Sequence, residues 1–347
     1  MSLPVRPMLT RLTDDPPNAE APISVLGRGL VPEPSFYVRS NFPVPRLDPT
    51  AWHLEVDGQV GRPGRLSLDD LQALPQAERT VVLECAGNGR TLMSPVPGGT
   101  PWGLGAVGVA RFGGIRLAAL LEARGGLRSS AIELVGTGAD HGTVEPDGEI
   151  PYQFNLPLRE LAATDPILAW EMNGRPLSAE HGAPVRLIVP GHYGMRSVKW
   201  LTRIDVLDSP FRGHFARKYR YRGQAGVADE TPVGEMRVRS LITEPSDGSE
   251  RDRGAVILRG IAWSGGGPIS TVDLDLDGVA VSATLGEPLD GTGPVAWHVT
   301  WERPPAGRHV VAVRATDAAG NRQPLEPIWN AGGYGNNVAQ RITLTVD

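Results

Sequence analysis

The single cysteine of this chain, Cys85, stands at the end of an apolar run and directly before a glycine-rich turn. The run 81–83 is typical of a buried strand, and Gly87-Asn88-Gly89 then favours a tight loop, because Gly and Asn tolerate positive φ. A thiol at the mouth of a strand, followed by exposed backbone N–H groups and Arg90, suits an anion or a metal cofactor. A buried structural cysteine is the alternative, since cysteine often behaves as a small apolar side chain.

Three arginines are the next candidates for chemistry. Arg39, Arg90 and Arg186 each stand at a strand or loop end among apolar residues. A buried unpaired charge is unfavourable, so each guanidinium needs a partner. The structural partner would be Asp or Glu. The functional partner would be an oxyanion or a phosphate, which matches the planar fork of arginine. The sequence leaves these two partners equally open.

The same cysteine allows a second class of enzyme. Cys85 with a histidine base would make a thiol hydrolase. No hydrolase signature surrounds Cys85, and the seven histidines show none of the spacings of a metal site. His181 and His192 flank the strand that holds Arg186, where each is either a surface residue or a site residue.

The elements that must position these residues are mostly short strands. With 347 residues the chain exceeds one hydrophobic core, and its 43 glycines and 32 prolines indicate many turns. Residues 1–235 mix strands and helices without a βαβ rhythm, which predicts an α+β fold: a mixed α/β domain with an extended N-terminal arm. Residues 236–347 carry regularly spaced short strands, which predict an all-β immunoglobulin-like sandwich.

Composition excludes several classes of function. The net charge of −5 argues against broad nucleic-acid binding. One cysteine excludes an internal disulfide, a Cys-x-x-Cys-His haem site and a cysteine-ligated iron–sulfur cluster within this chain. No apolar run approaches the ~20 residues that span a bilayer, so we expect no membrane partner. The first thirty residues lack a signal-peptide core, so we expect a cytoplasmic chain as given, or a periplasmic one if an export signal was removed.

Local patterns predict particular elements. Residues 67–74 have a Ser N-cap and apolar positions at helical spacing, which predicts a short helix. A second helix is predicted around residues 117–121, and a strand at 132–135 is expected to run into a polar loop at 136–142. Residues 103–108 match G-x-G-x-x-G by letter, but the strand before and the helix after are missing, so we expect no dinucleotide site.

The segment 84–90, Glu-Cys-Ala-Gly-Asn-Gly-Arg, resembles the cysteine loop of the sulfite oxidase family of molybdenum enzymes, in its bacterial, haem-free type. Further segments resemble the same family in the same order, over about residues 36–340. They are residues 36–45, 102–106, 114–117, 171–177, 181–186, 190–200, 243–245, 262–267 and 327–330. Any one segment would be weak, whereas ordered agreement over many segments is specific.

The resemblance implies a site. It implies that Cys85 binds molybdenum beside the dithiolene of one molybdopterin, that Arg39 and Arg90 hold an anionic substrate, and that Tyr221 donates a hydrogen bond or a proton. His181, Arg186 and Lys199 would fix the phosphate of the pterin. The full set of cofactor-binding residues that it implies is Asn41, Cys85, Asp140, His181, Arg186, Ser197, Val198 and Lys199.

The resemblance also implies an activity and partners. We expect a molybdenum-dependent oxidoreductase that oxidises sulfite to sulfate by oxygen-atom transfer at an oxo-molybdenum centre. Because the chain has no haem site, its electrons would pass to an external acceptor such as a cytochrome c. The second domain is usually the dimer interface in this family, so a homodimer is expected.

Three departures from the animal members keep alternatives open. Gly332 stands where they have an arginine, Asn41 stands where they have a histidine, and Tyr219 competes with Tyr221 for the place of the active-site tyrosine. The alternative function is therefore a molybdopterin-dependent reductase of S-oxides or another oxyanion. A remoter alternative is an immunoglobulin-like binding protein without enzymatic activity.

Overall fold

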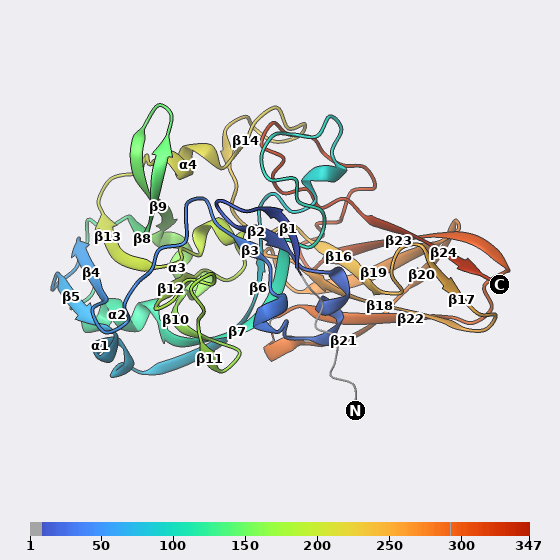
Figure 1. The fold of residues 1–347 in the computed structure, drawn as a ribbon, viewed down its shortest axis with the longest axis horizontal. Coiled ribbons are helices and arrows are strands. Elements are labelled where there is room, and N and C mark those ends of the chain that lie inside the picture. Colours follow the sequence, from blue (N-terminus) through green and yellow to red (C-terminus); the bar gives the residue numbers. More distant parts are fainter. Residues whose placement is uncertain (1–8, 292) are drawn as a thin grey trace.

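The structure of this chain, a computed structural model, describes residues 9–291 and 293–347. Figure 1 shows two parts: a mixed part on the left and an elongated pair of β-sheets on the right, whose far end carries the C-terminus. The N-terminal strands lie near the junction of the two parts. Among the described residues, no helix is both long and apolar enough to cross a membrane.

Three sheets build most of the first part. The N-terminal sheet has the order β1 (Thr10–Thr13), β2 (Asn18–Glu20), β3 (Val38–Arg39). The central sheet has the order β11 (Arg175–Pro176), β10 (Ile167–Met172), β7 (Val107–Arg116), β6 (Gln76–Glu84), with β12 (Arg186–Ile188) also paired to β10. The third has the order β5 (Gly64–Ser67), β4 (His53–Gly58), β13 (Leu201–Leu207), β8 (Glu133–Val144), β9 (Gly148–Pro157).

Short elements connect these sheets. The pair β14 (Arg220–Tyr221) and β15 (Thr231–Pro232) stands apart from them. The α-helices are α1 (Leu68–Gln72), α2 (Leu117–Ala123), α3 (Leu161–Thr164) and α4 (His214–Lys218). The 3₁₀ turns are η1 (Ile23–Arg28), η2 (Glu33–Ser35), η3 (Arg90–Leu92), η4 (Leu158–Glu160), η5 (Gly194–Arg196) and η6 (Leu289–Gly291). The described part of the chain is therefore mostly strand, with less helix than the α+β expectation suggests.

Local sequence explains why some predictions are confirmed. Helix α1 begins after Ser67, whose hydroxyl accepts a hydrogen bond from Asp70 N while the Asp70 carboxylate accepts from Ser67 N, a capping box. Helix α2 buries Leu117, Leu120 and Leu121. The segment 103–108 leads into strand β7, whereas a dinucleotide-binding fingerprint leads into a helix.

The predicted polar loop at residues 136–142 is wrong. These residues continue strand β8, which pairs with β9 across a register shift between Thr137 and His141. The polar side chains do not end the strand, because β9 supplies ladder partners on both sides of this irregularity.

The second part consists of two sheets on a common core. One sheet has the order β16 (Arg239–Glu244), β18 (Val256–Trp263), β22 (Val295–Trp301), β21 (Thr284–Pro288). The other has the order β17 (Ser249–Arg251), β24 (Gln340–Val346), β23 (Gly307–Asp317), β19 (Ile269–Leu276), β20 (Val279–Ser282). Side chains from both sheets, such as Leu258 and Val311, fill one buried cluster. The alternation of buried and exposed residues along β23 is the pattern that predicted these strands.

The two parts also share a core. Leu241, Ile261 and Trp263 belong to strands of the second part but pack into the hydrophobic cluster of the first. The division of the chain at residues 235 and 236 stays a prediction, and the contact between the parts proves important for the site.

Candidate active site

The cysteine loop is held by the ends of a long hairpin. Strands β6 and β7 pair from Gln76 and Ile115 to Glu84 and Val107, and Cys85 follows directly, with its N–H donated to Ala106 O at 2.9 Å. The Asn88 side chain donates to Glu84 and accepts from Ala106 N, which ties the turn back to both strands. Gly89 adopts φ +82°, where glycine is favoured. The free thiol of Cys85 is half-buried.

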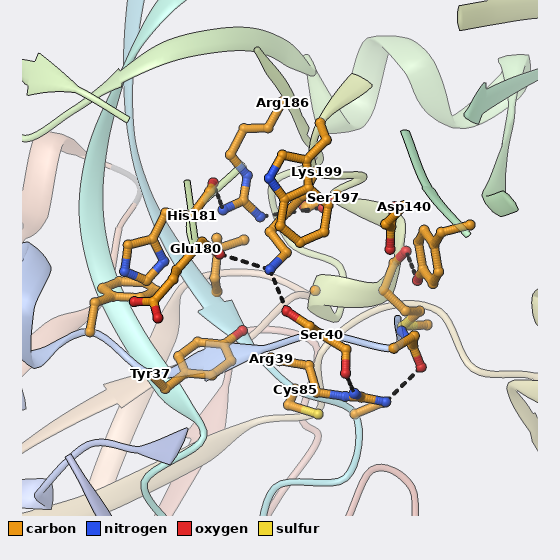
Figure 2. A pocket seen from close by; sticks show the side chains of 18 of the residues that line it. Tyr37, Arg39, Ser40, Cys85, Asp140, Glu180, His181, Arg186, Ser197 and Lys199 are labelled. Atoms are coloured by element: carbon orange, nitrogen blue, oxygen red, sulfur yellow. Dashed lines mark hydrogen bonds between the residues drawn. The ribbon is translucent and has the colours of Figure 1, made fainter. Parts of the chain in front are cut away.

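Cys85 lines a cavity in the first part of the chain (Figure 2). The residues come from the end of β6 and the cysteine loop, the segment around β3, strands β8 and β9, and the segments around β12, η5 and α4. They are Phe36, Tyr37, Arg39, Ser40, Asn41, Leu83, Cys85, Ala86, Asp140, Tyr152, Glu180, His181, Arg186, Gly194, Met195, Ser197, Lys199, Trp200 and Tyr219. The fold therefore brings together residues that are far apart in sequence.

Arg39 lies at the Cys85 end of the cavity, as Figure 2 shows. Its guanidinium donates to Asn18 Oδ1 at 3.1 Å, to Asn41 Oδ1 at 2.6 Å and to the Ser40 carbonyl. Burial lowers the pKa of Arg39, but the neighbouring Tyr219 and Cys85 outweigh this effect and raise it. Arg39 therefore stays cationic beside the thiol, and its hydrogen bonds go to neutral acceptors.

Further cations lie deeper in the cavity. The Lys199 ammonium donates to Ser40 Oγ at 3.1 Å and to Glu180 O at 2.8 Å, while Arg186 donates to the carbonyls of His181 at 2.8 Å and Ser197 at 3.3 Å. Burial, and then the positive charge of Arg186, hold the pKa of Lys199 well below its usual value. Burial lowers the pKa of Arg186 to about 10.

His181 and Asp140 complete this charged end of the cavity. Burial, with help from Lys199 and Arg186, lowers the pKa of His181 to about 3, so the imidazole is neutral at neutral pH. Burial raises the pKa of Asp140 to about 6, although Lys199 opposes the shift. Burial is the main cause of both shifts, and the nearby cations add to the shift of His181 but oppose that of Asp140.

The cavity carries polar atoms that the protein does not satisfy. Asp140 Oδ1 and Arg186 Nε are buried without a hydrogen-bond partner among the described residues. Buried polar groups are normally paired, so such atoms indicate a ligand. An anionic group with hydrogen-bonding edges, such as a pterin with a phosphate, matches both the unpaired atoms and the excess of cations. The residues present therefore fit the molybdopterin that the resemblance implies.

Most of the residues predicted for the site line this cavity. They are Arg39, Asn41, Cys85, Asp140, His181, Arg186, Ser197 and Lys199. Val198 does not line it: its side chain is fully buried, and its carbonyl accepts from Leu187 N at 2.8 Å. The described residues contain no group of three or more His, Cys, Asp or Glu side chains that could hold a metal ion.

Two predicted catalytic residues are not brought to the cavity. The Arg90 guanidinium donates to Thr100 O at 2.6 Å and to Gly332 O at 3.0 Å, and does not line it. Tyr221 lies in a neighbouring cavity, with the Arg237 guanidinium 4.5 Å from its ring centre. Tyr219, the competing tyrosine, lines both the Cys85 cavity and this neighbouring one.

The sequence analysis missed several lining residues. Tyr37, Ser40 and Glu180 lie within or beside the segments that resemble the sulfite oxidase family, but their residue types alone suggest no role. The signal for Tyr37 and Ser40 was their place beside Arg39, since strand neighbours of a site arginine are candidates for the same wall.

Comparison with known proteins defines the class. A family model described as "Oxidoreductase molybdopterin binding domain" matches residues 41–215. The mitochondrial sulfite oxidase of Rattus norvegicus is 37% identical over 375 residues, covering 99% of this chain and 67% of that protein. The nitrate reductase [NAD(P)H] of Hordeum vulgare is 33% identical over 382 residues, covering 98% of this chain and 42% of that protein.

Solved structures agree with this class. The sulfane dehydrogenase SoxCD from Paracoccus pantotrophus matches with a TM-score of 0.82 and 25% identity, covering 96% of this chain and 87% of that chain. The fold and the site thus define a molybdopterin-binding oxidoreductase. More particularly, the chain belongs to the sulfite oxidase family. A thiol hydrolase and a non-enzymatic immunoglobulin-like protein are therefore set aside.

Proposed function

We propose that this chain oxidises sulfite to sulfate and passes the electrons to a separate acceptor such as a cytochrome c. The observation that carries the proposal is the shared cavity wall of Cys85 and Arg39, with a row of buried cations beyond it. In this proposal Cys85 is the protein ligand of molybdenum. The molybdenum centre, held by one molybdopterin, supplies two-electron oxygen-atom transfer.

The side chains of the cavity have separate roles in the proposal. Arg39 attracts and orients the oxyanion by charge-assisted hydrogen bonds. Tyr219 takes the role that the sequence gave to Tyr221 and donates a hydrogen bond at the reacting end. Lys199, Arg186 and neutral His181 bind the phosphate of the cofactor. Asn41, Asp140 and Ser197 contact the pterin.

A second candidate is reduction of an S-oxide or another oxyanion by the same centre. One observation favours it: the family arginine is absent at Gly332, and Arg90 is engaged with two backbone carbonyls. Arg39 then remains as the arginine beside Cys85 in the cavity lining, which suits a substrate of lower charge. The nitrate reductase relative is a further reason to test other oxyanions.

Steady-state turnover of the cofactor-loaded protein tests the proposal. We expect sulfite to reduce cytochrome c or ferricyanide in its presence, and to bleach its visible absorption. If the protein instead reduces a sulfoxide with reduced viologen and leaves sulfite unchanged, the second candidate replaces the first. Nitrate reduction with the same donor would point to the oxyanion branch of that candidate.

We also propose a homodimer formed through the second part of the chain. Ile257 on β18 of one sheet, and Val279 on β20 and Val310 on β23 of the other, are exposed large apolar side chains, and burial of any of them against another copy would be favourable. Light scattering coupled to gel filtration measures the mass in solution. A monomer at all concentrations would contradict this part of the proposal.

A further inference from the structure

The residue before the cysteine carries a buried acid that the reaction does not use. Glu84 ends strand β6, and its side chain is 0% exposed. Glu84 does not line the cavity, although both Leu83 and Cys85 do. A carboxylate in such a place is unfavourable unless it is paired and hydrogen-bonded. Its partners therefore show what the fold requires at this position.

Two of the three partners of Glu84 come from the second part of the chain. Arg239 of β16 places Nε 2.9 Å from Glu84 Oε1, and Trp263 of β18 donates its indole N–H to Oε2 at 2.9 Å. The third partner, Asn88 of the cysteine loop, donates to Oε1 at 3.0 Å. The carboxylate thus links the second part to both ends of the segment that contains Cys85.

The buried guanidinium of Arg239 has few hydrogen-bond partners. It is 1% exposed, and neither its Nε nor its Nη1 makes a hydrogen bond in the described chain, so its contact with Glu84 is an ion pair only. Its Nη2 reaches Asn88 O only at 3.4 Å. Replacing a buried ion pair by apolar side chains is often neutral or stabilising. Stability alone is therefore a weak reason for the Glu84–Arg239 pair. Because the pair lies next to the cysteine loop, holding that loop in place is a second reason.

A second set of contacts holds the same loop from the other side. The segment between β23 and β24 donates Gly335 N to Ala86 O at 2.8 Å and the Asn336 amide to Gly89 O at 2.7 Å. The cysteine loop returns one bond, from Arg90 to Gly332 O at 3.0 Å. Backbone oxygens on both sides of the turn are thereby fixed by the second part.

We propose that Arg239 is a positioning residue for the Cys85 thiolate: through Glu84 and Asn88 it lets the second part of the chain set where that sulfur stands. The inference rests on the proposed role of Cys85 as the molybdenum ligand. Groups that orient a metal ligand without touching the metal commonly change metal affinity or activity by about 10- to 100-fold when they are removed. Arg239 acts at one further remove, through the backbone of the ligand loop.

The test uses the full chain loaded with its cofactor. For Arg239→Met we expect the thiolate-to-molybdenum absorption band to shift and the cofactor to be lost about 10- to 100-fold faster on gel filtration. The matched control is Arg259→Met, which removes an exposed ion pair with Glu244, 3.6 Å long, from the same sheet. The control should keep both the band and the rate of cofactor loss.

A double variant separates positioning from stability. Arg239→Met leaves an unpaired buried carboxylate, and Glu84→Gln/Arg239→Met removes that charge, so thermal stability should recover. If Arg239 positions Cys85, the band and the rate of cofactor loss stay altered in the double variant. If both return to the parent values together with stability, Arg239 has only a structural role and the inference is overturned.

Two further variants make every outcome informative. Should Arg239→Met not fold, Trp263→Phe removes the indole N–H that Glu84 accepts, together with part of a buried ring, and an unchanged band there overturns the inference. Cys85→Ser separates this inference from the proposed function. Retention of molybdenum with an unchanged band in Cys85→Ser would refute the ligand role, whereas an altered Cys85→Ser beside an unaltered Arg239→Met refutes the positioning role alone.

Discussion

The Cys85 cavity and the surroundings of Gln323 in the second part treat buried polar groups in opposite ways. In the second part, the buried Gln323 accepts from Ser240 N and Ala315 N and donates to Asn337 O. In the cavity, Asp140 Oδ1 and Arg186 Nε have no hydrogen-bond partner within residues 9–291 and 293–347. A core whose polar groups are satisfied needs nothing further. A cavity whose polar groups are not satisfied is built for a ligand.

The histidines repeat this contrast. A hydrogen bond that His309 donates to the Asp277 carboxylate raises the pKa of His309 in the second part, with burial opposing. Burial and two cations lower the pKa of His181 in the cavity to about 3. The second part uses an acid to stabilise a charged imidazole, whereas the cavity keeps its imidazole neutral among positive charges. The charge of the cavity is therefore arranged for an anion and not for the stability of the protein.

The largest expected effect comes from Cys85→Ser. A serine hydroxyl is a poor substitute for a thiolate as a ligand of a soft metal centre. We expect turnover to be abolished and the molybdenum content to fall, with little change in thermal unfolding, because the thiol is only half-buried. Metal analysis and sulfite-dependent ferricyanide reduction measure both. Full activity in this variant would show that catalysis does not depend on Cys85, and the cavity would then not differ from the second part as a binding site.

Removing a cavity cation should separate binding from stability. In Lys199→Met, the loss of a charge-assisted bond of about 1.5–3 kcal/mol should weaken cofactor retention. The cofactor-free protein should become more resistant to urea, because a buried ammonium is removed. Lys218→Met is the matched control, since Lys218 is the one other lysine of the chain and is exposed. A less stable cofactor-free Lys199→Met protein would argue that the cavity, like the second part, is arranged for stability.

The two histidines should give opposite pH dependences. The pKa of His181 in the folded protein is about 3, below its value in the unfolded chain. As the pH falls, the unfolded chain therefore takes up the proton at a higher pH than the folded protein does. Lowering the pH from 7 to 5 should therefore cost the cofactor-free protein about 2 kcal/mol through His181. His309 has a raised folded pKa, so its protonation stabilises the fold as the pH falls below 6.5 and this contribution is lost as pH rises.

Urea unfolding at both pH values checks this prediction. His181→Gln should remove the penalty at pH 5, so that this variant loses less stability on acidification than the parent. His309→Gln should lose more than the parent. If both variants lost more stability than the parent between pH 7 and pH 5, or both lost less, the contrast between the two regions would be contradicted.

The smallest expected effect distinguishes two neighbouring tyrosines. Tyr219→Phe removes a hydroxyl from the cavity, and a lost hydrogen bond of about 1.4 kcal/mol corresponds to a roughly ten-fold lower kcat/KM. Tyr221→Phe should change kcat/KM little, because Tyr221 lies in the neighbouring cavity. Cofactor content should stay at the parent level in both. A larger loss in Tyr221→Phe would restore the assignment made from sequence.

The sequence predicted much of the site because its signals are local. The apolar run before Cys85, the glycine turn after it and the capping box of α1 all act within a few residues. It could not predict which carbonyls hold the side chain of Arg90, because Thr100 and Gly332 are distant in sequence and no local pattern indicates them. It took residues 136–142 for a loop because the pairing of β8 with β9 overrides local polarity.

The choice between Tyr219 and Tyr221 could not be made from the sequence. Both are tyrosines in one short segment, and both are buried. Contacts with the rings of Phe154 and Tyr334, at 5.8 Å and 5.1 Å, fix the ring of Tyr219 at the cavity. Those rings lie far away along the chain, so spacing cannot reveal them.

By itself the sequence determined the chemistry: one thiol in a glycine-rich turn, the basic residues around it, and the ordered segments of the sulfite oxidase family. Only the tertiary structure decided which of those cations share a cavity with the thiol and which are consumed by backbone carbonyls. It also decided that a carboxylate beside the thiol is held by Arg239 of the second part. The physical reason is that residue types set what a group can do, whereas long-range packing sets what it can reach.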